Sequence, residues 1–361
     1  MSELYIGVMS GTSLDGIDIA LCEIDDKTCR LIYSYEYSFD KELKSDILDA
    51  ISGTTTLKKI GEIDTRLGMA YAEAINDFLN LYGIKKEDVS AIGLHAQTMW
   101  HEPHGDYPFS MQLGNASIVT AKTDICVVSD FRQKDIAFGG QGAPFAPAFH
   151  KFIFSKFGKN TAVLNIGGMA NLTILGDKLT GYDTGCGNVL MDMWIMQCKN
   201  LPFDKEGAFA KSGEINKELL ESMLNDEYFK KAPPKSTGRE YFNMSWLAKY
   251  LPLFQTLKDE DIQATLLELT ARSIAVEVKK AAVDTLIVCG GGAKNSYLME
   301  RLSSNLSGVE VSAGDKYGVD GEYMEAMAFA WLACERVHKR AVKLSTVTGA
   351  LRDSILGCIY E

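Results

Sequence analysis

Two apolar runs near the N-terminus enclose the segment Gly7-Val8-Met9-Ser10-Gly11-Thr12-Ser13-Leu14-Asp15-Gly16-Ile17-Asp18. The runs cover residues 4–9 and 17–24, and their spacing predicts two strands joined by a hairpin turn. Glycines in such a turn let the backbone approach a ligand closely, and successive N–H groups can bind an oxyanion. The segment is therefore a candidate phosphate-binding turn, with a plain glycine-rich hairpin as the alternative. It is not a Walker A loop, because no Gly-Lys-Ser/Thr follows.

The same order of features returns in the second half of the chain. Residues 162–166 predict an apolar strand, Gly167 and Gly168 a turn, and residues 172–175 a second strand. Other strand-like runs alternate with segments of helical periodicity such as residues 57–78. We therefore predict an α/β protein made of two duplicated lobes.

Length and charge narrow the class of protein. The chain has 361 residues, which suggests two domains at roughly 150 residues each. We expect residues 1–130 and the tail 341–361 to form the N-terminal lobe, and residues 131–340 to form the C-terminal lobe. The net charge of −11 disfavours nucleic acid and anionic membrane surfaces as partners.

The sequence lacks the marks of export. No apolar run is long enough to span a bilayer, and the N-terminus does not resemble a signal peptide. The 8 cysteines include no C-x-x-C pair, so we expect free thiols in a reducing compartment. These features predict a cytoplasmic protein.

Further glycine-rich turns carry polar residues. Two such hairpins at the starts of two lobes indicate a clamp on a polyphosphate. The turn Gly290-Gly291-Gly292 follows an apolar strand, where it suits a flat ring or a phosphate. It lacks the G-x-G-x-x-G spacing of a dinucleotide fold, which argues against an oxidoreductase. Asp183 heads another such turn, either as a helix N-cap or as a general base aimed into a cleft.

Other polar residues are candidates for substrate contacts. His95, His101 and His104 lie close in sequence, but no fourth ligand stands at a fixed helical offset, so hydrogen bonding is favoured over zinc binding. Arg132 follows a predicted strand and can bind a carboxylate or form an interlobe ion pair. Glu325 begins a predicted helix, where a carboxylate also complements the helix dipole.

Eight longer motifs stand in a fixed order along the chain. They are the segment Met9–Asp18, Asp130-Phe131-Arg132, Gly139-Gly140-Gln141-Gly142-Ala143-Pro144, Leu164-Asn165-Ile166-Gly167-Gly168, Asp183-Thr184-Gly185, Pro233-Pro234-Lys235-Ser236-Thr237-Gly238-Arg239-Glu240, Gln263-Ala264-Thr265 and Glu325-Ala326-Met327-Ala328-Phe329-Ala330-Trp331. Over essentially its whole length the chain resembles the anhydro-N-acetylmuramic acid kinases, a family of the actin-like ATPase and sugar kinase superfamily. The resemblance implies two duplicated lobes with ATP in the cleft between them, and a homodimer.

The resemblance also implies a reaction. The family's enzyme takes 1,6-anhydro-N-acetylmuramic acid, ATP and water. It opens the anhydro bridge and phosphorylates the 6-oxygen, giving N-acetylmuramic acid 6-phosphate and ADP in peptidoglycan recycling. ATP and Mg²⁺ are the implied cofactors.

Site residues follow from the same resemblance, position by position. Asp183 matches the catalytic base that deprotonates the attacking water, while Gln97, Arg132 and Glu325 match the sugar side. The ATP side is Gly11, Thr12, Ser13, Leu14, Asp15, Gly16, Ile17 and Asp18, with Gly167, Gly168, Gly290, Gly291 and Gly292. The ligands of Mg²⁺ stay open between Asp15, Asp18, Asp183, and water with phosphates only.

The chain departs from the family's usual pattern at three positions. Ala96 stands where the family has glycine, Trp100 where it has a basic residue, and Cys186 where it has proline. The loss of a charge at Trp100 leaves a kinase for a neutral anhydro sugar, such as levoglucosan, as an alternative. A plain hexose kinase and a non-catalytic actin-like nucleotide-binding protein are further alternatives.

Overall fold

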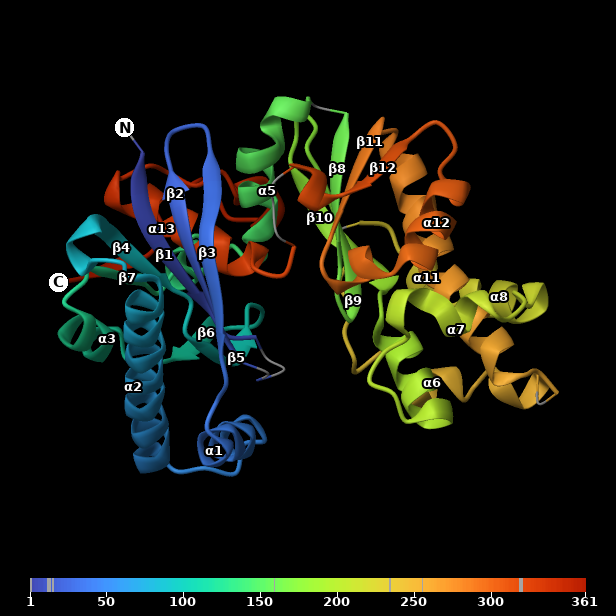
Figure 1. Cartoon of the computed structure of the whole chain (residues 1–361), viewed down its shortest axis with the longest axis horizontal. Coiled ribbons are helices and arrows are strands. Elements are labelled where there is room, and N and C mark those ends of the chain that lie inside the picture. The colour runs from blue at the N-terminus through green and yellow to red at the C-terminus, as the bar shows by residue number, and fades with distance from the viewer. Residues whose placement is uncertain are drawn as a thin grey trace. The chain divides into compact units, whose positions relative to one another are not determined.

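A computed structural model describes residues 2–11, 14, 16–158, 160–233, 235–254, 256–317 and 321–361. The chain forms two compact units (Figure 1): unit 1 is Met1–Ile153 with Tyr323–Glu361, and unit 2 is Phe154–Glu322. Within the described ranges, no helix has both the length and the apolar character needed to cross a membrane.

Unit 1 is built on a mixed sheet with the strand order β13-β7-β4-β1-β2-β3. Its strands are β1 (Glu3–Met9), β2 (Ile17–Ile24), β3 (Cys29–Tyr37), β4 (Val89–Leu94), β7 (Val127–Ser129) and β13 (Cys358–Tyr360). A separate ribbon pairs β5 (Gln97–Glu102) with β6 (Phe109–Leu113). Its helices are α1 (Lys41–Ile51), α2 (Leu57–Tyr82), α3 (Ala116–Thr123), α4 (Gln133–Ala137), α5 (Ala146–Phe154), α13 (Met324–Val337) and α14 (Ser345–Thr348).

Helix α2 covers one face of this sheet. The Thr56 side chain caps its N-terminus, and Gly83 ends it in the left-handed conformation. Its buried stripe, which includes Leu67 and Phe78, packs in one core with Ile6 and other sheet residues. The helical periodicity of residues 57–78 therefore predicted this helix correctly.

Helix α13 packs on the other face, where two glycines let it come close. Gly7 of β1 pairs with Gly93 of β4. A Cβ on Gly7 would overlap the carbonyl oxygen of Ala326, and one on Gly93 would overlap that of Phe329. The helix thus lies directly on the glycine pair, and this contact fixes the position of Glu325 in its first turn.

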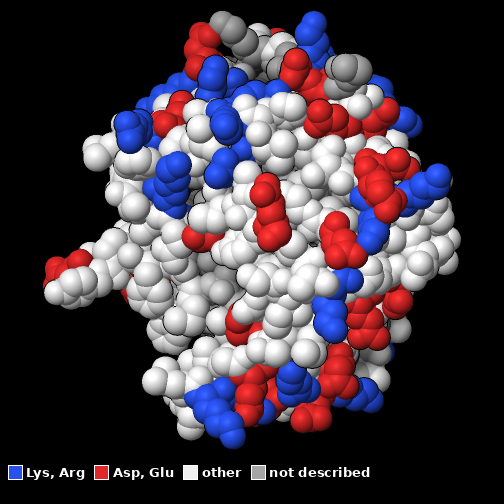
Figure 2. All heavy atoms as spheres, turned by 90° about the vertical axis from the view of Figure 1, so that its left-hand side faces the viewer, with Lys and Arg blue, Asp and Glu red and all other residues white. Residues whose placement is uncertain are grey.

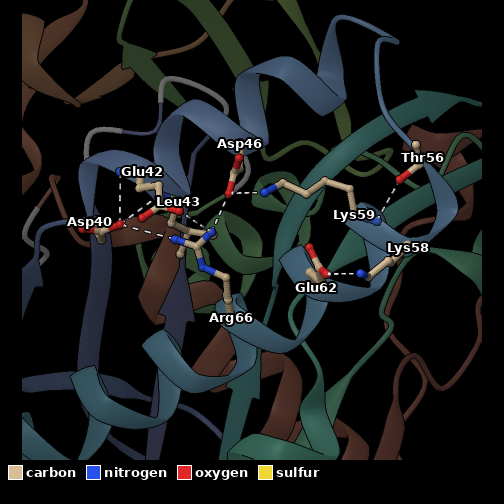
Figure 3. A network of polar contacts seen from close by, with 9 residues as sticks. All are labelled: Asp40, Glu42, Leu43, Asp46, Thr56, Lys58, Lys59, Glu62 and Arg66. Atoms are coloured by element: carbon tan, nitrogen blue, oxygen red, sulfur yellow. Dashed lines mark hydrogen bonds and ion pairs between the residues drawn. The ribbon is translucent and has the colours of Figure 1, made fainter.

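Ion pairs join α1 to α2 (Figure 3). Arg66 of α2 reaches Asp46 of α1 and lies 3.5 Å from Asp40, the N-cap of α1, and Lys59 Nζ lies 2.8 Å from Asp46. The cationic groups keep about a third of their surface exposed, so each pair contributes about 1 kcal/mol or less. The network holds α1 beside α2 without forming part of the core.

The described charged side chains are mixed over the surface in Figure 2. Lys and Arg stand among Asp and Glu over much of this face, and several of them gather at its upper left. The 8 cysteines are all free thiols, as the sequence predicts, and Cys358 is exposed.

Unit 2 repeats the sheet of unit 1 in the order β10-β9-β8-β11-β12. The strands are β8 (Thr161–Ile166), β9 (Met169–Ile174), β10 (Thr180–Cys186), β11 (Thr285–Cys289) and β12 (Glu310–Ala313). The helices are α6 (Val189–Lys199), α7 (Ala208–Lys211), α8 (Lys217–Leu224), α9 (Glu227–Lys230), α10 (Met244–Leu247), α11 (Asp259–Ala281) and α12 (Ser296–Asn305). Helix α11 is buried along most of its length and packs in the core of this unit.

The two sheets share one pattern of pairing. In each, a first strand pairs antiparallel with the second and the second with the third, and the next two strands add parallel on the other side of the first. The predicted hairpins at residues 4–24 and 162–175 are both present. The expected fold of two duplicated α/β lobes is confirmed.

The boundaries between the two units lie at other residues than the sequence patterns indicated. The changes fall after Ile153 and after Glu322 instead of near residues 130 and 340. Helices α5 and α13 belong to unit 1 because α13 packs on its sheet and Phe152 of α5 stacks on Trp331 of α13 at 5.5 Å.

Candidate functional site

The β1–β2 turn is the first predicted phosphate-binding segment. Thr12, Ser13 and Asp15 lie outside the described residues. Leu14 closes a turn by donating its N–H to Gly11 O at 3.1 Å, and it has a positive φ of 55°.

The side chains around this turn divide between core and surface. The side chains of Leu14 and Ile17 are fully buried in the core, so these two residues can contact a ligand only through their backbone. A Cβ on Gly16 would lie 3.1 Å from Glu36 and Tyr37 of β3. Asp18 pairs with Met9 at the end of the hairpin and is partly exposed.

Gln97 lies beside this turn. Its Nε2 lies 3.4 Å from Gly11 O and 3.3 Å from Thr98 O. The side chain is fully buried, and its Oε1 has no hydrogen-bond partner among the described residues. The structure thus brings a predicted sugar-side residue to the predicted phosphate turn.

Arg132 is held by neutral acceptors. Its Nε and Nη2 donate to His95 Nε2 at 3.2 and 2.7 Å, and its Nη1 donates to Gly142 O at 2.7 Å. The guanidinium also lies 5.1 Å from the ring centre of Phe145. Burial, together with the charge of Arg132, lowers the pKa of His95 well below its usual range, so His95 accepts as a neutral ring. These partners all belong to unit 1.

The charge of Arg132 is not neutralised by contact. Burial lowers its pKa to about 10, which still leaves it protonated at neutral pH. Within the described ranges no carboxylate lies within ion-pair distance of it; Glu325, in the first turn of α13, acts on it only as a nearby charge. Burial raises the pKa of the Glu325 carboxyl, and the charge of Arg132 lowers it. A guanidinium has five N–H donors, so two remain for a further acceptor.

A cavity of about 460 Å³ opens beyond the carboxyl ends of β4 and β7. Ala96 and Asp130 both line it, and both have positive φ, 64° and 56°. This conformation costs a non-glycine residue about 1–2 kcal/mol, and such strain gathers at functional sites. Amides and hydroxyls of Gln112, Asn115 and Ser117 add to a lining that has no Lys or Arg among its described residues. The Asp130-Phe131-Arg132 motif and the departure from glycine at Ala96 were signals in the sequence for this cavity.

In unit 2 the predicted glycine-rich turns meet. Gly187 N–H donates to Gly168 O at 2.9 Å, and Asn188 N–H donates to Gly167 O at 2.8 Å, which joins the β8–β9 turn to the start of α6. A Cβ on Gly290 would lie 2.5 Å from Asn165 Oδ1, so the turn after β11 packs against the same hairpin.

These glycines differ in the space around them. Gly290 and Gly292 are required by packing, because a Cβ on either would overlap Asn165 or Ile166. For Gly167, Gly168 and Gly291, no atom of the described residues beyond their chain neighbours lies closer than 3.7 Å to such a Cβ. Open backbone of this kind can approach a phosphate closely.

Asp183 lies within β10 and is held at three points. Its Oδ2 accepts from the Thr237 N–H at 2.9 Å, its N–H donates to Lys235 O at 3.0 Å, and its carbonyl accepts from Tyr228 Oη at 2.9 Å. The N-cap interpretation is wrong, because β10 continues to Cys186 and Asn188 is the N-cap of α6.

The surroundings of Asp183 suit a base. Burial raises the pKa of its carboxyl, the Thr237 hydrogen bond lowers it, and the charge of Glu240 raises it; the net pKa lies above the usual value. A carboxylate with a raised pKa accepts a proton more readily.

Comparison with known proteins agrees with this geometry. A family model described as anhydro-N-acetylmuramic acid kinase matches residues 3–361. The chain belongs to the anhydro-N-acetylmuramic acid kinase family. Relatives of that name occur in Sulfurimonas denitrificans (62% identity, covering 100% of both chains), Sulfurovum sp. (53%, 99% of both) and Vibrio vulnificus (48%, 99% of this chain and 98% of the relative). A ROK hexokinase structure from Thermus thermophilus matches 93% of this chain and 99% of its own at 16% identity and a TM-score of 0.40.

Family membership and the repeated strand order agree on a chain built from two duplicated α/β lobes. For an anhydro-N-acetylmuramic acid kinase, the predicted residues fall into two groups. Gly11, Gln97, Arg132 and Glu325 belong to unit 1, whereas Asp183 and the open glycines belong to unit 2. The segment around Lys235 and Thr237, which holds Asp183, had no predicted role beyond its motif.

Proposed function

We propose that the protein opens the 1,6-anhydro ring of 1,6-anhydro-N-acetylmuramic acid with water and phosphorylates the 6-oxygen with ATP, a step of peptidoglycan recycling. The observation that carries the proposal is Asp183, a partly buried carboxylate with a raised pKa and one oxygen fixed by a backbone N–H. A purely nucleotide-binding protein of this superfamily has no need for such a group.

In the proposed reaction Asp183 takes a proton from a water molecule. The water oxygen bonds to the anomeric carbon, and the bond from that carbon to the 6-oxygen breaks. The 6-oxygen keeps the electron pair and bonds to the γ-phosphorus, and ADP leaves. Because the leaving oxygen is phosphorylated, no second carboxylate is needed as an acid, unlike in ordinary glycosidases.

The nucleotide is assigned to the glycine-rich turns. Gly167, Gly168 and Gly291 offer open backbone, and Gly290 and Gly292 give their turn its shape. In unit 1 the turn from Gly11 to Asp18, with Leu14 and Ile17 acting through their backbone, is the second assigned contact. Positioning and charge stabilisation are the main requirements of phosphoryl transfer.

Mg²⁺ fits the carboxylate at the end of the unit 1 turn. Magnesium is usually held by one or two carboxylates plus phosphate oxygens and water, so Asp18 with the nucleotide and water would complete a site. The described residues contain no ready-made group of three His, Cys, Asp or Glu ligands, which suits a metal that arrives with ATP. Bound there, it would neutralise charge on the phosphates.

The acidic sugar is favoured over a neutral one by Arg132. Two of its N–H groups have no acceptor among the described residues, and its charge meets no described carboxylate. A lactyl carboxylate could accept both N–H groups as a bidentate partner. Gln97, with its unpartnered Oε1, and Glu325 are assigned to the hydroxyl and amide groups of the same sugar.

The test is a comparison of three sugars. Purified protein is given ATP with 1,6-anhydro-N-acetylmuramic acid, with N-acetylmuramic acid, or with levoglucosan, and ADP release is followed with mass spectrometry of the sugar product. A sugar phosphate carrying one added water, formed from the acidic anhydro sugar, is the expected result. Turnover of levoglucosan alone would show that the substrate is a neutral anhydro sugar. No turnover of any sugar would favour a non-catalytic nucleotide-binding protein. A homodimer and a cytoplasmic location stay predictions, open to sedimentation and fractionation.

A further inference from the structure

We propose that the buried ion pair between Lys235 and Glu277 positions the Asp183 carboxylate for proton transfer. It acts through residues 235–237, here named the strap. Lys235 and Glu277 are thus positioning residues that touch no reacting atom. The inference rests on the proposed function, since it requires Asp183 to be the base.

The strap lies along β10 beside Asp183, the proposed general base. Its first residue, Lys235, accepts the Asp183 N–H through its carbonyl at 3.0 Å, and its last, Thr237, donates its N–H to Asp183 Oδ2 at 2.9 Å. In the part of the chain that the structure describes, no other group donates a hydrogen bond to this carboxylate. The orientation of the carboxylate therefore depends on the place of Thr237.

The strap has little else to fix it. It belongs to no helix or strand, and Ser236 is exposed. Lys235 is its anchor: the side chain is 2% exposed, with Nζ 3.1 Å from Glu277 Oε1 and 5.3 Å from the ring centre of Tyr228. Tyr228 in turn donates its hydroxyl to the Asp183 carbonyl.

Glu277 connects Lys235 to β10, the strand that contains Asp183. It stands on α11 with its side chain 2% exposed. Tyr182, next to Asp183 on β10, donates its hydroxyl to Glu277 Oε2 at 3.2 Å. One carboxylate thus ties both the strap and β10 to the same helix. Lys280 also donates to Glu277, at 3.0 Å, but its side chain is 57% exposed.

A buried ion pair is a costly way to stabilise a fold. Apolar residues of similar volume often do as well or better, whereas a charge left without its partner is strongly destabilising. Buried pairs can instead fix one arrangement of neighbouring segments, and here the arrangement fixed is that of the strap on β10.

The arrangement has a measurable consequence. The Thr237 N–H bonds the ionised carboxylate and so lowers the pKa of Asp183 against the effect of burial. If the strap loosens, this bond weakens and the pKa rises. Since the base must be ionised, the acid limb of the kcat profile then moves to higher pH.

The test uses the full chain and its three-sugar assay. Lys235→Met combined with Glu277→Leu removes both charges at similar volume, so folding is retained. We expect kcat to fall about ten-fold or more, with the acid limb at higher pH and the KM for ATP unchanged. Lys280→Ala removes the exposed partner of the same Glu277 and is the matched control, with kcat within about two-fold of wild type.

The outcomes separate the two proposals. Wild-type turnover with an unmoved acid limb in the folded double variant would overturn the positioning role and leave the proposed function intact. So would an equal effect of Lys280→Ala. Absence of turnover by the wild-type protein would overturn both.

Discussion

The glycine pair under α13 makes a sharp prediction for Gly7→Ala. The added Cβ would overlap the Ala326 carbonyl oxygen, so the helix must retreat by at least about 1 Å. Overpacking against a backbone that cannot rotate away costs about 3 kcal/mol, the upper end of the usual range. For a unit of this size that lowers the melting temperature by about 6–12 °C.

The same shift reaches the proposed site. Glu325 stands in the first turn of the displaced helix, and a misplacement of about 1 Å can reduce turnover about 100-fold. The assays are thermal unfolding and sugar-dependent ADP release. The matched control is Gly61→Ala in α2, where a Cβ meets no atom of the described residues within 4 Å; it should gain about 0.5–1 kcal/mol of stability. An unchanged melting temperature in Gly7→Ala, beside a normal control, would refute the close packing of α13.

Three further predictions concern single charged residues. Asp183→Asn keeps the shape of the base but not its proton affinity, so kcat should fall about 10²–10⁴-fold while ATP affinity, measured by calorimetry, changes little; substantial remaining turnover would end its assignment as base. Arg132→Ala should raise the KM for the acidic anhydro sugar by about ten-fold or more and leave that for levoglucosan nearly unchanged, because only the former offers a carboxylate; equal effects on both would contradict that contact. Burial raises the pKa of Asp192 to about 6, above its unfolded value, so this carboxyl destabilises the fold as pH rises from about 4 to about 7. Asp192→Asn should therefore be more stable than wild type by about 2 kcal/mol at pH 8 and lose that advantage at pH 4, which urea unfolding at the two pH values will measure.

Local signals were enough to predict the two hairpins and helix α2. Glycine-rich turns between apolar runs gave both β1–β2 and β8–β9, and residues 57–78 gave α2. These elements follow from backbone freedom and periodicity, which are properties of neighbours in sequence. The assignment of α13 to a lobe was different, because it depends on Gly7 and Gly93, which meet only when β1 and β4 pair. Glycines inside apolar strands were the available signal, since they mark a close approach of another backbone.

Sequence motifs selected the residues of the candidate site, and the roles of these residues stay predictions. Motifs pointed to Asp183, Arg132 and the glycines, and the structure brings Gln97 to the Gly11 turn. It could not be foreseen that Lys235 would be buried with Glu277, since the burial of a charge depends on partners far along the chain. The cavity beside Ala96 and Asp130 is also a product of strand order, because the ends of β4 and β7 adjoin only in the folded sheet.

The repeated strand order makes β3 and β10 equivalent strands, but the residues at matching positions have different roles. Asp183 pairs with Asn171, which takes part in the second residue pair from the tip of the β8–β9 hairpin. In the β1–β2 hairpin the second pair contains Ile19, and Ile19 pairs with Tyr35 of β3. Tyr35 is therefore the counterpart of Asp183. Tyr35 packs against the core of unit 1 with its ring 6.2 Å from Phe78. The repeated sheet thus carries an aromatic core residue at this position in unit 1 and the proposed base at the same position in unit 2.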